Sequence, residues 1–153
     1  MVERDAISLL KEDHRKVKAL LEEMENTTER SKVKRAKLLD KIDTELRVHT
    51  DLEETIFYPA FRDAVTKRGD REMYFEALEE HHVVKRVLPE LKATDPSSEP
   101  FAAKAKVLKE LVTHHAGEEE REMFPEARKV LDTAALQELG KRMLAKKKKL
   151  LAR

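Results

Sequence analysis

His49-Thr50-Asp51-Leu52-Glu53-Glu54-Thr55-Ile56-Phe57-Tyr58-Pro59 recurs later in the chain as His115-Ala116-Gly117-Glu118-Glu119-Glu120-Arg121-Glu122-Met123-Phe124-Pro125. In both copies a His lies ten residues before a Pro, and a Glu follows that His by four residues. Residues four apart stand on the same face of an α-helix, one turn above each other. Each copy therefore presents an imidazole and a carboxylate to one point, which suits a transition metal. Two copies suggest two such half-sites facing each other.

Two further histidines interrupt apolar stripes in the same duplicated way. His14 lies in the middle of a stripe with three-and-four spacing, which predicts an amphipathic helix over about residues 4–25, with Asp5 as its cap. His81 takes the same place in a helix predicted over about residues 70–92, 67 residues later. The two stripes match one for one: Ile7, Leu10, His14, Val17, Leu21 and Met24 against Tyr74, Ala77, His81, Val84, Leu88 and Leu91.

Helix boundaries follow from turn residues. The second helix is expected to start between residues 31 and 37 and to end near residue 66, with a kink at Pro59. Gly69 and Asp70 are expected to close it and to cap the third helix. The fourth helix is predicted over about residues 100–130, with Pro100 in its first turn. Its inner side is expected to present Val107, Leu108, Leu111, His115 and Glu119.

The offset between the two halves is 67 residues for His14 and His81, and 66 for His49 and His115, so the chain is interpreted as a duplicated helical hairpin. The predicted fold is all-α: an up-down-up-down four-helix bundle in residues 1–131, and a fifth helix in residues 132–153. Asp132 is the expected cap of that fifth helix, which should pack along the outside of the bundle or on its end. The run Lys146-Lys147-Lys148-Lys149 is interpreted as its solvated C-terminus, where cations favour the helix dipole.

Composition limits the function classes. The chain has 153 residues, of which 41% are charged, with three Gly and five Pro, as expected of an all-helical protein. The absence of Cys excludes thiolate metal sites, disulfides and thiol catalysis. A formal net charge of +1 gives no reason to expect nucleic acid or membrane as a partner. No stretch approaches the roughly 20 apolar residues of a membrane span, and no signal peptide is evident, so we expect a cytoplasmic protein.

Six polar residues are expected on the inner faces of the helices. A single His on an apolar stripe is more often a hydrogen-bonded core residue than a ligand, but Glu is almost never buried without a partner or a metal. Imidazole and carboxylate without thiolate suit iron, manganese or zinc, and six ligands are too many for one tetrahedral ion. In the ferritin-like pattern Glu precedes His by three residues, whereas in both motif copies His comes first and Glu follows by four, so that family is not indicated. The zinc-protease His-Glu-x-x-His motif is absent. The predicted metal ligands are His14, His49, Glu53, His81, His115 and Glu119.

This arrangement resembles the hemerythrin-like family, the His-His-Glu cation-binding domain proteins, over roughly residues 5–130. The resemblance rests on His14 and His81 within their acidic contexts and on the two copies of the His-to-Pro motif. It implies a non-haem di-iron centre bridged by two carboxylates and by an oxo or hydroxo group derived from solvent. By this resemblance Glu53 and Glu119 are the bridging residues, and the four histidines are terminal ligands.

The chain also departs from the oxygen carriers of that family, which use two histidines four apart on the third helix. Here Ala77 and Lys85 occupy the positions four residues either side of His81. His82 and His114 remain alternative extra ligands, and Glu120 remains an alternative to Glu119. A six-ligand site leaves more open coordination positions than a carrier has, which favours redox chemistry or sensing over transport.

The expected function is therefore binding or reduction of a small oxygen species (O2 or peroxide) or of nitric oxide. An iron- or oxygen-responsive sensor without turnover is the alternative. Three carboxylates near the histidines are candidates for holding the outward imidazole nitrogens: Glu12, Glu54 and Glu118.

Overall fold

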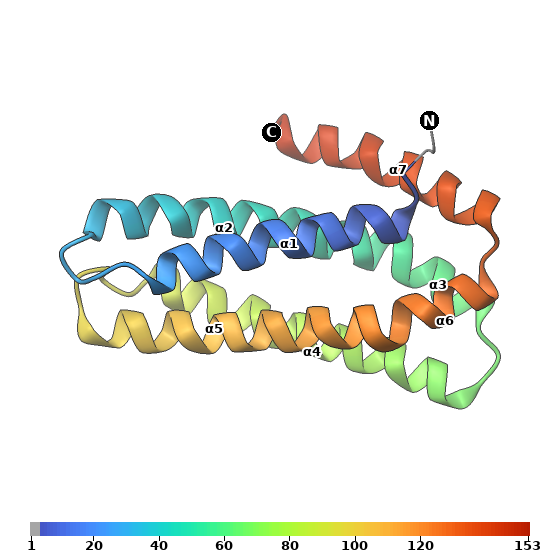
Figure 1. Cartoon of the computed structure of the whole chain (residues 1–153), viewed down its shortest axis with the longest axis horizontal. Coiled ribbons are helices and arrows are strands. Elements are labelled where there is room, and N and C mark those ends of the chain that lie inside the picture. Colours follow the sequence, from blue (N-terminus) through green and yellow to red (C-terminus); the bar gives the residue numbers. More distant parts are fainter. Residues whose placement is uncertain (1–3) are drawn as a thin grey trace.

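Four long helices run side by side as an antiparallel bundle in the computed structural model, which describes residues 4–153 (Figure 1). They are α1 (Ala6–Glu25), α2 (Lys32–Leu52), α4 (Arg68–Lys92) and α5 (Glu99–Glu118). Helix α1 packs against α2 and α5, and α4 packs against α5 and α2. The helices therefore form a closed ring around one interior, which confirms the predicted fold.

The helices begin where the sequence predicted, except for α4. The Asp5 carboxylate accepts a hydrogen bond of 2.8 Å from the Ser8 backbone N–H, as expected of the cap of α1. The prediction that Gly69 and Asp70 form a junction was wrong, because α4 already begins at Arg68. Extended backbone at Val65 and Lys67 ends one helix and starts the next. Asp70 lies buried in the first turn of α4, where a carboxylate favours the positive end of the helix dipole.

A π-helical turn interrupts each motif-bearing helix just before its proline. Helix α2 continues through η1 (Glu53–Phe57) into α3 (Tyr58–Ala64), and α5 continues through η2 (Glu119–Met123) into α6 (Phe124–Val130). The Tyr58 backbone N–H donates to the Glu53 carbonyl five residues back, and Phe124 does the same to Glu119. A proline lacks the N–H and its ring clashes with the carbonyl four residues before it. A widened turn relieves this clash, and both turns begin at a predicted ligand.

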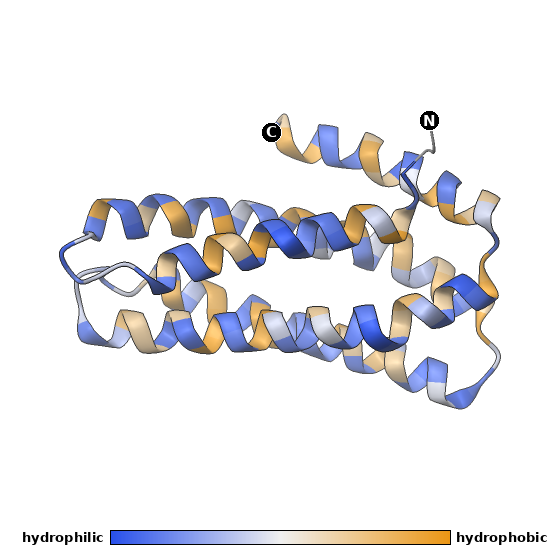
Figure 2. Ribbon diagram, viewed as in Figure 1, coloured by the Kyte–Doolittle hydropathy of each residue, from blue (hydrophilic) through white to orange (hydrophobic). Residues whose placement is uncertain are grey.

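The apolar core is divided into two clusters by a polar layer. One cluster surrounds α3, α6 and α7 (Thr133–Leu151), and its largest buried side chains are Tyr58, Phe57, Phe61 and Phe124. The other fills the opposite end of the bundle around Ile42 and Leu108. Figure 2 shows apolar residues recurring between hydrophilic ones along each helix. Such amphipathic helices bury one face and leave the other in water.

One predicted core position on α5 was wrong. Val107 is 48% exposed, whereas Leu108 is fully buried. Val107 stands about 80° round the helix from His115, which places it outside the buried stripe.

Helix α7 lies along the outside of α1 and α2 (Figure 1). Asp132 caps it by accepting a 2.7 Å hydrogen bond from the Ala135 N–H. The prediction that the run of lysines 146–149 is solvated was wrong for Lys146 and Lys147. Lys146 lies 2.8 Å from the Asp51 carboxylate, and Lys147 lies 3.0 Å from Asp13. Within residues 4–153, no helix combines the length and apolar character needed to cross a membrane.

Candidate metal centre

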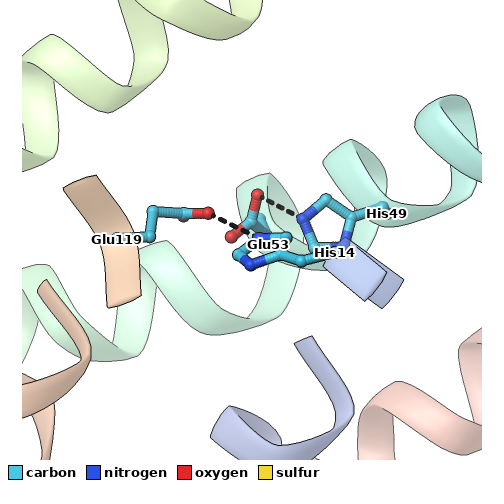
Figure 3. A group of neighbouring side chains, drawn as sticks. All are labelled: His14, His49, Glu53 and Glu119. Carbon is cyan, nitrogen blue, oxygen red and sulfur yellow. Dashed lines mark hydrogen bonds and ion pairs between the residues drawn. The ribbon is translucent and has the colours of Figure 1, made fainter. Parts of the chain in front are cut away.

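The polar layer is built from two histidine pairs and two glutamates, all of them less than a tenth exposed. The first hairpin supplies His14, His49 and Glu53, and the second supplies His81, His115 and Glu119. Their ligand atoms form two overlapping groups: His14, His49, Glu53 and Glu119 in one, and Glu53, His81 and His115 in the other. Within each group the atoms lie within 4.8 Å of one another, and Figure 3 shows the first group.

Each glutamate reaches one histidine of each hairpin. Glu53 Oε1 lies 3.0 Å from His49 Nε2 and 3.0 Å from His81 Nε2. Glu119 Oε1 lies 3.0 Å from His14 Nε2 and 3.3 Å from His115 Nε2. Both carboxylates therefore lie between the two histidine pairs, where a carboxylate can bridge two cations.

Four further carboxylates orient the histidines from outside. A carboxylate only accepts hydrogen bonds, so each outward Nδ1 carries a hydrogen, and a neutral ring then directs its Nε2 lone pair inward. Metal-ligating histidines are usually held in this way. The Nδ1 partners are Glu120 for His14 (3.0 Å), Asp13 for His49 (2.9 Å), Glu54 for His81 (2.9 Å) and Glu80 for His115 (2.7 Å).

The inward atoms do not satisfy one another. Nε2 of His81 and Nε2 of His115 face each other at 3.1 Å, where two neutral rings with hydrogens on Nδ1 would oppose their lone pairs and two charged rings would oppose their hydrogens. Within the described chain, His49 Nε2 and Glu53 Oε2 have no hydrogen-bond partner, although His49 Nε2 lies 3.0 Å from Glu53 Oε1. Buried polar atoms seldom stay unpaired. Converging imidazole nitrogens and carboxylate oxygens in this state fit a metal cation.

Electrostatics also favour positive charge at this layer. Burial acts to lower the pKa of His49, but the carboxylates of Glu53 and Asp13 outweigh it and raise the pKa to about 10. Burial likewise opposes the effect of Glu119 on His115, whose pKa is nevertheless raised well above its usual value. Burial would raise the pKa of Glu53, yet His49 holds it well below the usual range. Carboxylates that stabilise protonated imidazole this strongly will also attract a divalent cation.

Tyr58 adds a hydroxyl to one side of the layer. Its Oη donates to Glu119 Oε2 at 2.7 Å and lies 3.2 Å from His81 Nε2 and 3.3 Å from His115 Nε2. Burial, then the carboxylates of Glu119 and Glu53, raise the pKa of Tyr58 well above its usual value, so the hydroxyl keeps its proton at neutral pH. The equivalent residue of the second motif copy is Phe124, which stacks on His14. Sequence reasoning assigned Tyr58 no role.

The alternative ligands fall outside the buried groups. The His82 side chain is 66% exposed and lies 3.8 Å from Glu79. His114 is 62% exposed and belongs to a separate group. Glu120 holds the outward nitrogen of His14, while Glu119 is buried inside the cluster.

Of the outer carboxylates expected from the sequence, only Glu54 holds a histidine of the cluster. Glu12 pairs with Arg4, and Glu118 pairs with His114. Asp13, Glu80 and Glu120 were not predicted in this role, and Glu120 was considered only as an alternative ligand. A shared signal was available, since each of them is directly adjacent to a predicted ligand.

A cavity of about 20 Å³ adjoins the histidines on the side of the second core cluster. Its lining combines all four imidazoles with apolar side chains that include Val17, Leu46, Val84 and Val112. A volume of roughly 10–15 Å³ accommodates one water-sized probe, so this space suits a molecule of very few atoms.

Comparisons with known proteins agree with this geometry. Residues 5–127 match the family described as hemerythrin HHE cation binding domain. A crystal structure of a hemerythrin HHE cation binding domain-containing protein from Mycobacterium kansasii is 30% identical, with a TM-score of 0.83 over 98% of this chain and 88% of that one. A curated protein of Nostoc sp., named DNA nickase, is 27% identical over 142 residues. That match covers 93% of this chain but 39% of the relative, so the chain spans about two fifths of its length.

Proposed function

The chain belongs to the hemerythrin HHE cation binding domain family, and we propose that its buried His/Glu cluster holds two non-haem iron ions that bind or reduce O2, peroxide or nitric oxide. The observation that supports this most strongly is the position of Glu53 and Glu119 between two histidine pairs. One ion would be held by His14 and His49 and the other by His81 and His115, with both glutamates shared.

The donor set suits iron, the metal of this proposal. Imidazole and carboxylate ligands suit iron, manganese and zinc, and the chain has no thiolate to favour a closed structural zinc site. Four imidazoles and two shared carboxylates give each ion about four protein ligands. An octahedral metal would therefore keep positions open for a small ligand.

A ferrous pair, when bound, would supply two electrons and Lewis-acid stabilisation for a reduced oxygen ligand. The chain's own residues supply the rest. Tyr58 keeps its proton and places its hydroxyl 3.2 Å and 3.3 Å from the Nε2 atoms of His81 and His115. A ligand atom held beside this histidine pair is therefore within reach of a proton donor. The small cavity lined by Val84 and Val112 restricts the site to ligands of very few atoms.

A surface groove between α2 and α4 lies next to the internal cavity. It has a volume of about 350 Å³ and is lined by Leu46, Thr50, Asp51, Glu54, Val84 and Lys85, among others. Leu46, Thr50 and Val84 also line the internal cavity. Movement of these three side chains would connect the cavity to the groove and let a diatomic molecule or peroxide enter.

A sensor without turnover is the second candidate, and the contact of α7 with the site favours it. Lys147 of α7 binds Asp13, which in turn holds His49. A change in the charge of the two metal ions would weaken or strengthen the contact between Lys147 and Asp13, and would thereby change how firmly α7 packs on the bundle. Metal- or redox-dependent exposure of α7 to proteolysis, with negligible turnover, would support this function.

Nicking of DNA is the named activity of the Nostoc relative, which is more than twice as long as the match. We do not propose it for this chain, because Lys146 and Lys147 are engaged in ion pairs with aspartates of the bundle. Our proposal excludes nucleic acid as a partner. Incubation of the iron-loaded protein with supercoiled plasmid tests this, and strand nicking would contradict it.

The test is the iron content and optical spectrum of protein loaded anaerobically with ferrous iron and then exposed to O2 or peroxide. We expect two irons per chain and the absorption band of a coupled di-ferric pair. Glu53→Ala should lose at least one iron and that band, because a shared ligand is removed, while His82→Ala serves as the exposed control. A Glu53→Ala protein with two irons and full oxygen reactivity would refute the assignment.

A further inference from the structure

The four outer carboxylates differ in how their charge is compensated. Three of them face a lysine: Asp13 with Lys147 at 3.0 Å, Glu54 with Lys85 at 2.7 Å and Glu120 with Lys18 at 4.0 Å. The fourth, Glu80, has no lysine or arginine partner within residues 4–153. Its polar neighbours are His115, His114 and a second carboxylate, Glu118.

The duplication explains why the surroundings of Glu80 differ from those of the other three outer carboxylates. His114 and Glu118 correspond in the first motif copy to Val48 and Leu52, which are buried in the cluster that includes α7. Helix α7 packs mainly on the first hairpin, against α1, α2 and η1, where it also brings Lys147 to Asp13. On the second hairpin the same two positions are polar, and no helix of the described chain supplies a cation to Glu80.

Glu80, His114 and Glu118 have the geometry of a metal site. His114 and Glu118 lie one turn apart on α5, with His114 Nε2 3.0 Å from Glu118 Oε1. Glu80 reaches across from α4, and its Oε2 lies 3.6 Å from the same nitrogen. The three ligand atoms lie within 4.8 Å of one another.

A second observation points to a small ligand at this place. A cavity of about 10 Å³, the space of about one water molecule, opens beside Glu80 and Glu118. It extends to Glu119 of the buried cluster, so the exposed and the buried groups share one lining. His114 does not line this cavity, which lies on the inner side of the two glutamates. Five carboxylates line it together with Met73, Ala77 and Met123: Glu76, Glu80, Glu118, Glu119 and Glu122. Carboxylates gathered around a space of this size favour a cation.

We propose that Glu80, His114 and Glu118 form an exposed, exchangeable divalent-cation site on the outer face of α4 and α5. A cation there would compensate the charge of Glu80, as lysines compensate the charges of the other three outer carboxylates. One imidazole and two carboxylates suit a first-row ion such as Fe²⁺, Mn²⁺ or Zn²⁺, with water completing the coordination. Glu80 joins this site to the buried centre, because its Oε1 accepts a 2.7 Å hydrogen bond from His115 Nδ1.

Titration with Co²⁺ tests the proposal. The protein is first loaded with iron and freed of excess metal, and Co²⁺ binding is then measured by equilibrium dialysis and by the visible bands of the ion. We expect one Co²⁺ per chain in the unaltered protein. His114→Ala and Glu118→Gln should each weaken its binding at least about tenfold at matched iron content, since a direct ligand is lost.

His82→Ala is the matched control, because His82 is equally exposed and lies near a single carboxylate, Glu79. It should bind Co²⁺ as the unaltered protein does. Stoichiometric binding that all three variants retain would overturn the proposal, and so would its absence from the unaltered protein. The outcome is independent of the di-iron proposal, because it is a difference between variants that persists whatever metal the buried cluster holds.

Discussion

The two motif copies build the same scaffold but surround it differently. His49, Glu53 and Pro59 of the first copy and His115, Glu119 and Pro125 of the second lie at equivalent places in helix and π turn. The first copy ends in Tyr58, whose hydroxyl enters the polar layer, whereas the second ends in Phe124, an apolar ring. Helix α7 packs mainly against α1, α2 and η1, so it lies over the helix that carries the first copy rather than over the second.

The difference separates what holds a metal pair from what determines its chemistry. The duplicated residues are the six predicted ligands and their four outer carboxylates, as a symmetrical pair of ions would require. The residues that differ add one proton donor, on the side of His81 and His115, and one lysine from α7, on the side of His49. The two ions of the proposed pair would therefore be inequivalent, with the reactive ligand on the Tyr58 side.

Tyr58→Phe makes the two copies alike and should have the largest effect. The ring would keep its stacking on His81, but Glu119 Oε2 would lose its donor and the site its proton source. We expect peroxide or O2 turnover to fall about 100-fold at unchanged iron content, which is typical for loss of a general acid. Steady-state rates on protein matched for iron measure this.

Tyr74→Phe is the matched control, because Tyr74 is the other tyrosine of the chain and contacts Tyr58 edge to face. It should leave turnover unchanged. If Tyr58→Phe turned over at the normal rate, the hydroxyl would have no part in proton transfer. If both variants slowed equally, packing of the aromatic cluster rather than the Tyr58 proton would be responsible.

Lys147→Met tests the other asymmetry, the link from α7 to the first copy. The substitution keeps an apolar stem but removes the contact that fixes the position of the Asp13 carboxylate, so the orientation of His49 behind its Nδ1 is less well defined. Loss of an orienting contact behind a ligating histidine typically costs 10–100-fold in metal affinity, and we expect about tenfold faster iron release to a chelator. The neighbouring exposed Lys148→Met should release iron at the normal rate. Equal release from both variants would mean that α7 does not support the site.

Much of the scaffold was predictable because it is periodic and duplicated. His14 and His81 interrupt matching apolar stripes, so their inward placement followed from helical spacing alone. Caps such as Asp5 depend on interactions three residues away and were equally accessible to sequence reasoning. The ligand assignment of the six buried residues stays a prediction, but their convergence on one layer is what the spacing implied.

Features that depend on neighbouring elements were not predictable. Pro59 signals a broken hydrogen bond, but whether the backbone kinks or widens into a π turn depends on the packing around it. Asp13 points about 100° away from His14, so only the order of helices in the ring determines that it meets His49. Lys147 belongs to a run of four lysines, and only the position of α7 distinguishes it from Lys148.

Gly140→Ala should have the smallest effect and tests how closely α7 must lie on the start of α1 in the first hairpin. An added Cβ would lie 2.8 Å from the Arg4 carbonyl oxygen and 3.1 Å from the Ala6 nitrogen, so α7 or the start of α1 must shift. Overpacking of this kind costs about 1–3 kcal/mol, which corresponds to a melting temperature lower by roughly 3–9 °C for a chain of this size. Gly69→Ala is the matched control of opposite sign, since nothing lies within 4 Å of its Cβ and alanine favours the helix by up to about 1 kcal/mol. Calorimetry of both metal-loaded variants measures this difference. If Gly140→Ala melts at as high a temperature as Gly69→Ala, then α7 is mobile on the bundle, and its lysines do not need a fixed position on the first hairpin.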